Sequence, residues 1–150
     1  MNNDRRKELN AKRIATLDLE LIEIAELGIE ELEEMGWRPY CVQALRTMDE
    51  QAALFAQGRE SLDAVNALRK KVGWDNLEAA DNKIVTRARP GASKHNFGKA
   101  FDIVNIDDEG NVEWENESFY DDAETVFCNH GLTWGGSWKN FQDQPHFELS

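Results

Sequence analysis

Two short segments hold the residue types that are best suited to bind a metal ion. The chain has three histidines, and two of them stand near a carboxylate in sequence: His95 precedes Asp102, and Asp143 precedes His146. Two imidazoles and one carboxylate can hold a catalytic zinc ion and leave a fourth position open for water. His95, Asp102 and His146 are therefore the candidate metal ligands.

The first segment has a backbone pattern that could bring its two ligands together. Gly98 permits a tight turn between His95 and a strand predicted over 100–106. Asp102 shares one face of that strand with Ala100, because side chains alternate between the two faces of a strand. An aspartate among apolar neighbours is costly to bury unless a cation pairs with it.

The second segment presents its histidine at the start of a strand. Pro145 excludes a helix here, so Asp143 is expected in a loop just before a strand over 146–149. His146 and Glu148 then point to the same face of this strand. The spacing alone is equally compatible with a buried Asp–His pair that binds no metal.

The remaining elements follow from apolar periodicity and from residues that begin or end helices. Apolar residues at helical spacing predict a helix over 16–35, which Gly36 ends. Thr47 and Glu50 have the spacing of a capping box, so a helix is expected from Thr47 to Gly58. The other predicted elements are a strand over 40–46, a helix over 61–72, a polar loop over 73–83, a strand-like segment over 84–86, a hairpin with its turn at 107–111 and its return at 112–114, a helix over 121–130 and a strand over 132–134.

This order of elements predicts an α+β fold with a small, mostly antiparallel sheet backed by helices. The length of 150 residues predicts a single domain, 1–150. No internal repeat and no low-complexity segment interrupts it.

The charge of the chain argues against two classes of partner. It has 29 Asp and Glu against 17 Lys and Arg, a formal net charge of −12. Nucleic acids and anionic lipids both favour clustered basic residues, so neither is expected to bind. No apolar run is long enough for membrane insertion, and residues 1–15 lack the apolar stretch of a secretory signal. Cys41 and Cys128 are expected to be free, buried thiols.

The two metal-ligand segments resemble the zinc D-alanyl-D-alanine carboxypeptidase and L-alanyl-D-glutamate endopeptidase family, in its endolysin-like branch. That family is marked by a Ser-x-His-x-x-Gly-x-Ala-x-Asp segment and a later (Asp/Glu)-x-x-His, which here run from Ser93 to Asp102 and from Asp143 to His146. The resemblance extends from about residue 9 onward. Its weaker parts are Leu45-Arg46-Thr47, Glu50-Gln51 and Gln57-Gly58-Arg59, which resemble the upstream arginine segment, and Trp134-Gly135-Gly136-Ser137-Trp138, which resembles the tryptophan-glycine stretch.

The resemblance implies a hedgehog-like or DD-peptidase-like fold with one zinc ion per chain, held by the three candidate ligands. It also implies that Asp143 acts as general base and later as acid, and that Arg46 faces the substrate and helps to hold the developing oxyanion. An exposed aspartate has a pKa of about 3.9, and zinc lowers it further, so desolvation must offset this effect at Asp143. Many relatives have Glu at this position, and the Asp favours an endopeptidase over a dipeptidase.

Five further residues are candidates for substrate contacts or for supporting the ligands, and four of them have a plainer alternative. Glu148 could orient a ligand imidazole or be a solvated carboxylate at a strand end. Ser93 could hydrogen-bond in the metal-site turn or only begin it. Trp134 and Trp138 could line a groove or belong to the core. Gln51 belongs to the segment that resembles the family's arginine region.

Three other features have alternatives that remain open. Without the resemblance, Arg46 would be read as a surface charge next to a helix start. His130 suits the C-terminus of a helix, where it interacts with the dipole, and is not expected to be a ligand. The acidic run 107–117 is expected to be a solvated hairpin, since it lacks the pattern of a calcium-binding EF-hand.

The predicted function is hydrolysis of the bond between L-alanine and D-glutamate in the stem peptides of peptidoglycan. The chain is expected to be a monomeric phage lysis enzyme for thin-walled, Gram-negative hosts, made in the host cytoplasm without a signal peptide and acting on the cell wall after release. One rival is a D-alanyl-D-alanine carboxypeptidase with the same site, and another is a zinc-bound, inactive module that binds wall peptides. Residues 60–82 depart from the family as an insertion, either a lid or an extra surface helix.

Overall fold

The computed structural model describes all 150 residues and divides them into two compact units. The first unit consists of Met1–Leu45 and Phe97–Ser150, and the second consists of Arg46–Asn96. The sheet lies entirely in the first unit, and the second unit is helical. No helix is both long and apolar enough to cross a bilayer.

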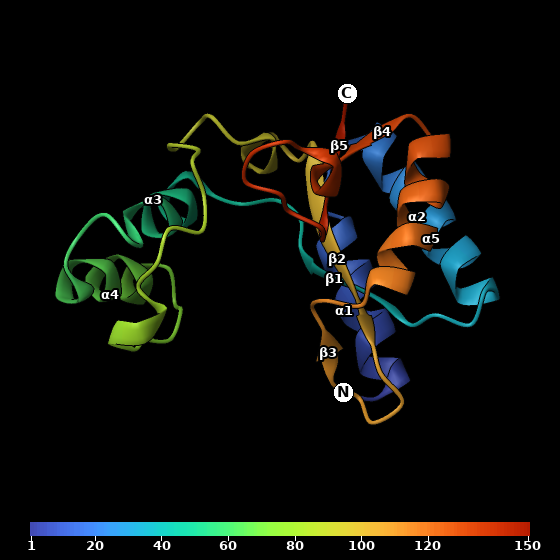
Figure 1. The fold of residues 1–150 in the computed structure, drawn as a ribbon, viewed down its shortest axis with the longest axis horizontal. Coiled ribbons are helices and arrows are strands. Elements are labelled where there is room, and N and C mark those ends of the chain that lie inside the picture. Colours follow the sequence, from blue (N-terminus) through green and yellow to red (C-terminus); the bar gives the residue numbers. More distant parts are fainter. The chain divides into compact units, whose positions relative to one another are not determined.

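The first unit is an antiparallel sheet with three α-helices (Figure 1). The strands lie in the order β1-β2-β5-β4, and the short β3 pairs with β2 as the return of a hairpin. This confirms the predicted α+β class. The elements of this unit are α1 (Asn3–Ile14), α2 (Leu19–Glu34), β1 (Pro39–Gln43), β2 (Ala100–Ile106), β3 (Val112–Glu113), α5 (Glu117–Asn129), β4 (Leu132–Trp134), the 3₁₀ turn η3 (Gly135–Ser137) and β5 (His146–Leu149).

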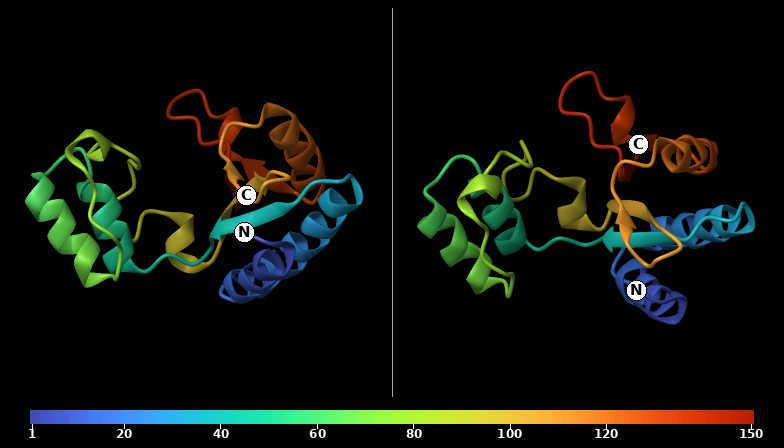
Figure 2. Two further views of the ribbon diagram at one scale, coloured as in Figure 1. Left: turned by 90° about the horizontal axis from the view of Figure 1, so that it is seen from below. Right: turned by 60° about the horizontal axis from the view of Figure 1, so that its bottom comes forward.

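One face of the sheet forms the main core with α2 and α5, which pack against each other (Figure 2). Phe101 of β2 and Phe147 of β5 point to this face, and the ring of Phe127 on α5 lies 5.2 Å from the first and 4.9 Å from the second. The two helices approach closely at Gly28, where a Cβ atom would lie 2.1 Å from Phe127. The alternation of β2 therefore directs its phenylalanine into the core and its aspartate to the opposite face.

The opposite face of the sheet is covered by α1 at one end. Tyr40 and Val104 pack there with Leu9 of α1. Arg6 and Asn10 of α1 are also buried and donate to the Pro39 carbonyl at 2.6 and 2.9 Å. This helix was not predicted from the sequence, because its buried side is partly polar and lacks apolar periodicity.

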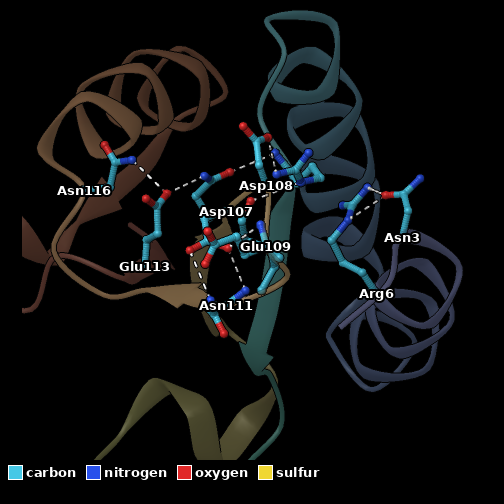
Figure 3. A network of polar contacts seen from close by, with 11 residues as sticks. Asn3, Arg6, Asp107, Asp108, Glu109, Asn111, Glu113 and Asn116 are labelled. Carbon is cyan, nitrogen blue, oxygen red and sulfur yellow. Dashed lines mark hydrogen bonds and ion pairs between the residues drawn. The ribbon is translucent and has the colours of Figure 1, made fainter.

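The hairpin between β2 and β3 is held by side chains of the acidic run (Figure 3). Asp107 Oδ1 accepts a hydrogen bond from the Asn111 backbone at 2.8 Å. This bond is the largest of several that lower the pKa of Asp107. Glu113 Oε2 accepts from the side-chain amides of Asn105 at 2.6 Å and Asn116 at 2.9 Å. The run thus forms the predicted hairpin, and its carboxylates bind neighbouring amides.

The second unit consists of α3 (Met48–Ala56), α4 (Leu62–Lys71) and the 3₁₀ turn η1 (Ala79–Asp81). The predicted capping box is present: Thr47 Oγ1 accepts from the Glu50 backbone at 3.1 Å, and Glu50 Oε1 accepts from the Thr47 backbone at 2.9 Å. Gly58 follows α3 with φ of 75°, a conformation that favours glycine.

Four local predictions are wrong. Residues 84–86 form no strand, and Ile84 and Val85 are 50% and 46% exposed. The helix predicted from residue 121 begins at Glu117, because the Asn116 side chain caps it by accepting from the Phe119 backbone. The strand predicted over 40–46 ends at Gln43, where the pairing with β2 becomes irregular. Both cysteines are free, but Cys128 is exposed on α5 and only Cys41 is buried.

Candidate metal centre

The pairing of β2 with β5 places Asp102 directly opposite His146. Residues that are opposite each other on neighbouring strands point to the same face of the sheet. The Nδ1 atom of His146 lies 3.2 Å from Asp102 Oδ1. His146 is buried and Asp102 is half-buried. Sequence alternation and strand register together therefore bring two of the three predicted ligands into contact.

Glu148 contacts the other ring nitrogen of His146. Its Oε1 atom lies 2.9 Å from Nε2, on the same face of β5. Burial is the largest single influence on the pKa of His146 and lowers it, but other influences outweigh it. Hydrogen bonds to Asp102 and Glu148, with the charges of Asp102 and Asp143, raise that pKa to about 9. In the metal-free chain this imidazole is therefore a cation that donates from both nitrogens.

Asp143 stands at the edge of this cluster, with Oδ2 4.0 Å from His146 Nδ1. Its loop is fixed by backbone hydrogen bonds from Asp143 to the Gly135 carbonyl at 3.0 Å and from His146 to the Asp143 carbonyl at 3.2 Å. A Cβ atom on Gly135 would lie 2.5 Å from the Asp143 carbonyl oxygen and 3.0 Å from His146 Cβ. The tryptophan-glycine stretch thus leaves space for the loop that carries Asp143.

His95 lies in the 3₁₀ turn η2 (Lys94–Phe97), the short element before β2. Its backbone N–H donates to Ser93 Oγ at 3.2 Å, which agrees with a structural part for Ser93 in this turn. Its carbonyl accepts from the Arg46 backbone at 2.9 Å. After the turn, Gly98 has φ of 70° and its carbonyl accepts from the Asp18 backbone at 2.9 Å. The predicted glycine turn between His95 and Asp102 is therefore present.

His95, Asp102 and His146 form a group that could hold a metal ion, with one ligand atom from each lying within 4.8 Å of the others. Two nitrogen donors and one carboxylate oxygen suit zinc better than magnesium or calcium, which prefer oxygen ligands. The bond from Nε2 of His146 to Glu148 would orient the imidazole with Nδ1 toward the ion. The donor set therefore fits the predicted zinc ion.

Arg46 and Gln51 are both buried in the second unit, so Arg46 is not a surface charge. Arg46 Nη1 donates to Gln51 Oε1 at 2.9 Å, and Gln51 Nε2 donates to the Ala88 carbonyl at 2.8 Å. The Arg46 backbone N–H also donates to the His95 carbonyl. The Arg46 side chain is thus held by Gln51 on α3, and its backbone is held by the turn that carries His95. The Arg46 backbone and His95 thus lie side by side in the second unit.

The two tryptophans differ in their surroundings. Trp134 stacks on Phe147 of the core with ring centroids 6.4 Å apart, and its Nε1 donates to the Gln144 carbonyl at 2.7 Å. Trp138 lies with its ring 5.1 Å from the ring of His146. Trp134 is therefore a half-buried residue that packs against the core, whereas Trp138 borders the metal group. His130 is paired with Glu31 at 3.2 Å and is not part of the group.

Asn96 is a supporting residue that the sequence analysis missed. Its Oδ1 accepts from the Gly91 backbone at 3.0 Å, and its Nδ2 donates to the Arg46 carbonyl at 3.0 Å. It is buried beside His95 and ties the two ends of the second unit together. No periodicity marks it, and its place directly after a candidate ligand was the only available signal.

Comparisons with known proteins agree with this geometry. Residues 86–149 match a family model described as D-alanyl-D-alanine carboxypeptidase. A curated relative, the peptidoglycan L-alanyl-D-glutamate endopeptidase CwlK of Bacillus subtilis, is 31% identical over 115 residues. That match covers 71% of this chain and 58% of the relative, so the chain spans little more than half of its length.

Solved structures show the same fold at low sequence identity. The L-Ala D-Glu endopeptidase ChiX of Serratia marcescens has a TM-score of 0.57 at 19% identity, with 95% of this chain and 86% of that chain covered. The LD-carboxypeptidase LdcB has a TM-score of 0.61 at 15% identity, with 89% and 58% covered. The D,D-pentapeptidase VanY, solved as a mutant with Zn(II), has a TM-score of 0.58 at 18% identity, with 89% and 72% covered.

These findings confirm the family resemblance and the fold. All four residues of the predicted metal segments, His95, Asp102, Asp143 and His146, fall within the range that matches the family model. The chain thus has the fold of these solved peptidases, and its residues 86–149 match the model of the D-alanyl-D-alanine carboxypeptidase family.

Proposed function

We propose that the chain is a zinc-dependent peptidase that hydrolyses the bond between L-alanine and D-glutamate in peptidoglycan stem peptides. The observation that carries this proposal is the grouping of His95, Asp102 and His146 within 4.8 Å. Support for the bond comes from CwlK, the relative that is itself named an L-alanyl-D-glutamate endopeptidase. The proposed substrate is therefore a cell-wall peptide, and the proposed cofactor is one zinc ion per chain.

Three side chains would hold the zinc ion: His95, Asp102 and His146. When bound, zinc would supply Lewis-acid chemistry to a water molecule and to the scissile carbonyl. Glu148 would keep His146 in the tautomer that offers Nδ1, by accepting from Nε2–H. The chain would thus provide a fixed ligand set that is supported by a further carboxylate.

Asp143 is the proposed general base and acid. Its Oδ2 lies 4.0 Å from His146 Nδ1, so it is close enough to the ligands to take a proton from water near them. It would then return that proton to the leaving amine of D-glutamate. Arg46, held by Gln51, would stabilise negative charge on the scissile carbonyl oxygen.

Digestion of purified muropeptides, analysed by mass spectrometry, tests this function. We expect new fragments that begin with D-glutamate, and we expect a chelator to abolish them and added zinc to restore them. An Asp143→Asn variant should keep its zinc and lose hydrolysis. Unchanged hydrolysis in that variant would remove Asp143 from the mechanism.

A carboxypeptidase is the second candidate, because residues 86–149 match the D-alanyl-D-alanine carboxypeptidase model and because LdcB, an LD-carboxypeptidase, shares the fold. Loss of a single terminal alanine, with no new D-glutamate N-terminus, would establish this alternative. A protein that retains zinc and binds muropeptides but cleaves none would instead be a wall-binding module.

A phage lysis role is a finer part of the proposal and rests on the endolysin-like motif. We propose that the chain acts on the cell wall after release from the cytoplasm in which it is made, and that it does so as a monomer. Purified protein should clear a suspension of outer-membrane-permeabilised Gram-negative cells. Unchanged turbidity beside a positive control lysin would argue against this role, and light scattering would test the monomer.

A further inference from the structure

The two units differ sharply in charge. The second unit, Arg46–Asn96, has nine Lys and Arg against seven Asp and Glu, a net charge of +2. The first unit has eight against 22, a net charge of −14, and the two together give the −12 of the whole chain. The excess of basic residues in an otherwise acidic protein is therefore confined to one unit.

Two of these basic residues are gathered on one aromatic ring. The guanidinium of Arg59 lies 3.9 Å from the centroid of the Phe55 ring, and that of Arg89 lies 4.9 Å from the same centroid. Arg59 Nη1 also donates to the Phe55 carbonyl at 2.6 Å, which restricts its position. Both arginines are exposed, and neither forms an ion pair with a carboxylate of the chain.

This arrangement is unusual in a chain with such an excess of acids. Two like charges repel when they share one ring, and nearby Asp or Glu would ordinarily neutralise them. Stacking on an aromatic ring leaves the N–H edges of a guanidinium available to an anion. Side chains that are already held in place lose less entropy on binding. The cluster is therefore suited to bind a carboxylate from outside the chain.

The position of the cluster relates it to Arg46 within the same unit. Phe55 lies one turn after Gln51 on α3, about 6 Å further along the helix axis. Gln51 holds Arg46 on one side and the Ala88 carbonyl on the other, and Arg89 directly follows Ala88. The Arg59–Arg89 pair thus lies about one helical turn from the residue that fixes Arg46.

We propose that Arg59 and Arg89, stacked on Phe55, form a carboxylate-binding subsite for the substrate peptide. This inference rests on the proposed function, because it assigns the ligand of the subsite to a stem peptide. A glutamyl residue uses only one of its two carboxyl groups in the chain, so the substrate carries a free carboxylate near the scissile bond. An extended peptide advances about 3.3–3.6 Å per residue, so a carboxylate within a few residues of that bond matches the separation along α3.

Two synthetic peptides test the subsite. Both are L-alanyl-D-glutamyl-L-lysyl-D-alanine, one with its glutamyl and C-terminal carboxylates free and the other with both converted to amides. The variants are Arg59→Gln and Arg89→Gln, with Lys70→Gln as the control, since Lys70 is an exposed basic residue of the same unit. Circular dichroism and thermal melting show whether each variant is folded.

For the zinc-loaded protein we expect each arginine variant to lose about tenfold in kcat/KM on the acidic peptide, mainly through KM, because charged hydrogen bonds to a carboxylate are lost. The amidated peptide should show no such loss, and Lys70→Gln should match the wild type on both. Arg89→Lys should recover part of the loss. Equal losses on both peptides, or no loss on either, would overturn the subsite.

Calorimetric binding to the metal-free protein separates this inference from the proposed function. If the wild type cleaves neither peptide but binds the acidic one more tightly, and Arg59→Gln or Arg89→Gln removes that preference, the subsite stands and the proposed function fails. If the wild type cleaves the peptide and binds both forms equally, the proposed function stands and the subsite is wrong.

Discussion

The Nε2 atom of His146 lies 2.9 Å from Oε1 of Glu148, two residues further along β5. Nδ1 of the same ring lies 3.2 Å from Asp102. The His146 ring is therefore held between two carboxylates. Asp102 is a candidate metal ligand, and Glu148 is not. Because Glu148 fixes the direction of this ring, we expect it to contribute to metal affinity.

We expect Glu148→Ala to lower zinc affinity by about 10–100-fold, the range found when the partner of a ligating histidine is removed. Competition with a chromogenic chelator measures this change. Glu26→Gln, an exposed change on α2, is the control and should bind zinc as the wild type does. Wild-type affinity in Glu148→Ala would show that β5 orients His146 without help.

The stability of the metal-free chain should depend on pH through His146. Its folded pKa of about 9 exceeds the ordinary value of 6.5, so the folded state binds this proton more tightly than the unfolded state. The resulting stabilisation is fully present below pH 6.5 and is lost as the pH rises through about 9. Urea unfolding with a chelator present, at several pH values, measures it. His146→Gln should flatten this part of the profile, and a parallel profile in that variant would contradict the assignment.

Zinc binding should release a proton near pH 7.5, because Nδ1 of His146 must lose its proton to become a ligand. Calorimetric titrations in buffers with different ionisation enthalpies count the protons released. We expect about one fewer proton for His146→Gln than for the wild type. The same proton release in both proteins would place the titrating group elsewhere.

Gly135→Ala should displace the loop that carries Asp143. The added Cβ would lie 2.5 Å from the Asp143 carbonyl oxygen, and backbone atoms at that distance must move. We expect a loss of hydrolysis. We also expect weaker zinc binding, because the added Cβ would lie only 3.0 Å from the Cβ of His146 and would displace this ligand. Ser137→Ala, an exposed change in the same 3₁₀ turn, serves as the control. Full activity in Gly135→Ala would show that the loop carrying Asp143 can move without loss of hydrolysis.

The two thiols should differ in reactivity. Burial, and after it the charge of Asp102, raise the pKa of Cys41 to about 12 against the opposing charge of Arg13. Cys128 is exposed on α5, although burial of part of its side chain raises its pKa as well. At pH 8 a thiol reagent should modify one cysteine per native chain and two per unfolded chain. Cys128→Ser should react only after unfolding, and rapid reaction in its native state would contradict the burial of Cys41.

The parts of the candidate metal centre that were predicted correctly are those that depend on neighbouring residues in the sequence. The alternation along 100–106 correctly placed Phe101 and Asp102 on opposite faces of β2. Pro145 correctly limited the final strand to the residues from His146 onward. Both inferences depend on a period of two and on the fixed geometry of proline, which neighbouring elements cannot easily override.

Elements and contacts that depend on buried or capping polar side chains could not be predicted from the sequence. Helix α1 buries Arg6 and Asn10, so a search for apolar periodicity could not find it. The capping side chain of Asn116 begins α5 four residues earlier than its acidic residues indicated. Asn96 supports His95 through three backbone groups that only the folded unit brings together. The partners of these residues are distant in sequence and belong to no repeating pattern.

The hydrogen bond between the Arg46 backbone and the His95 carbonyl closes the base of the second unit at 2.9 Å. The first residue of this unit and a residue next to its last are therefore hydrogen-bonded to each other, and the chain between them forms a closed loop. Residues 60–82 lie between these two ends, so a change in their length would not by itself separate His95 from Arg46. A change of that kind would leave Asp102 and His146 in place, because they lie on β2 and β5 of the first unit.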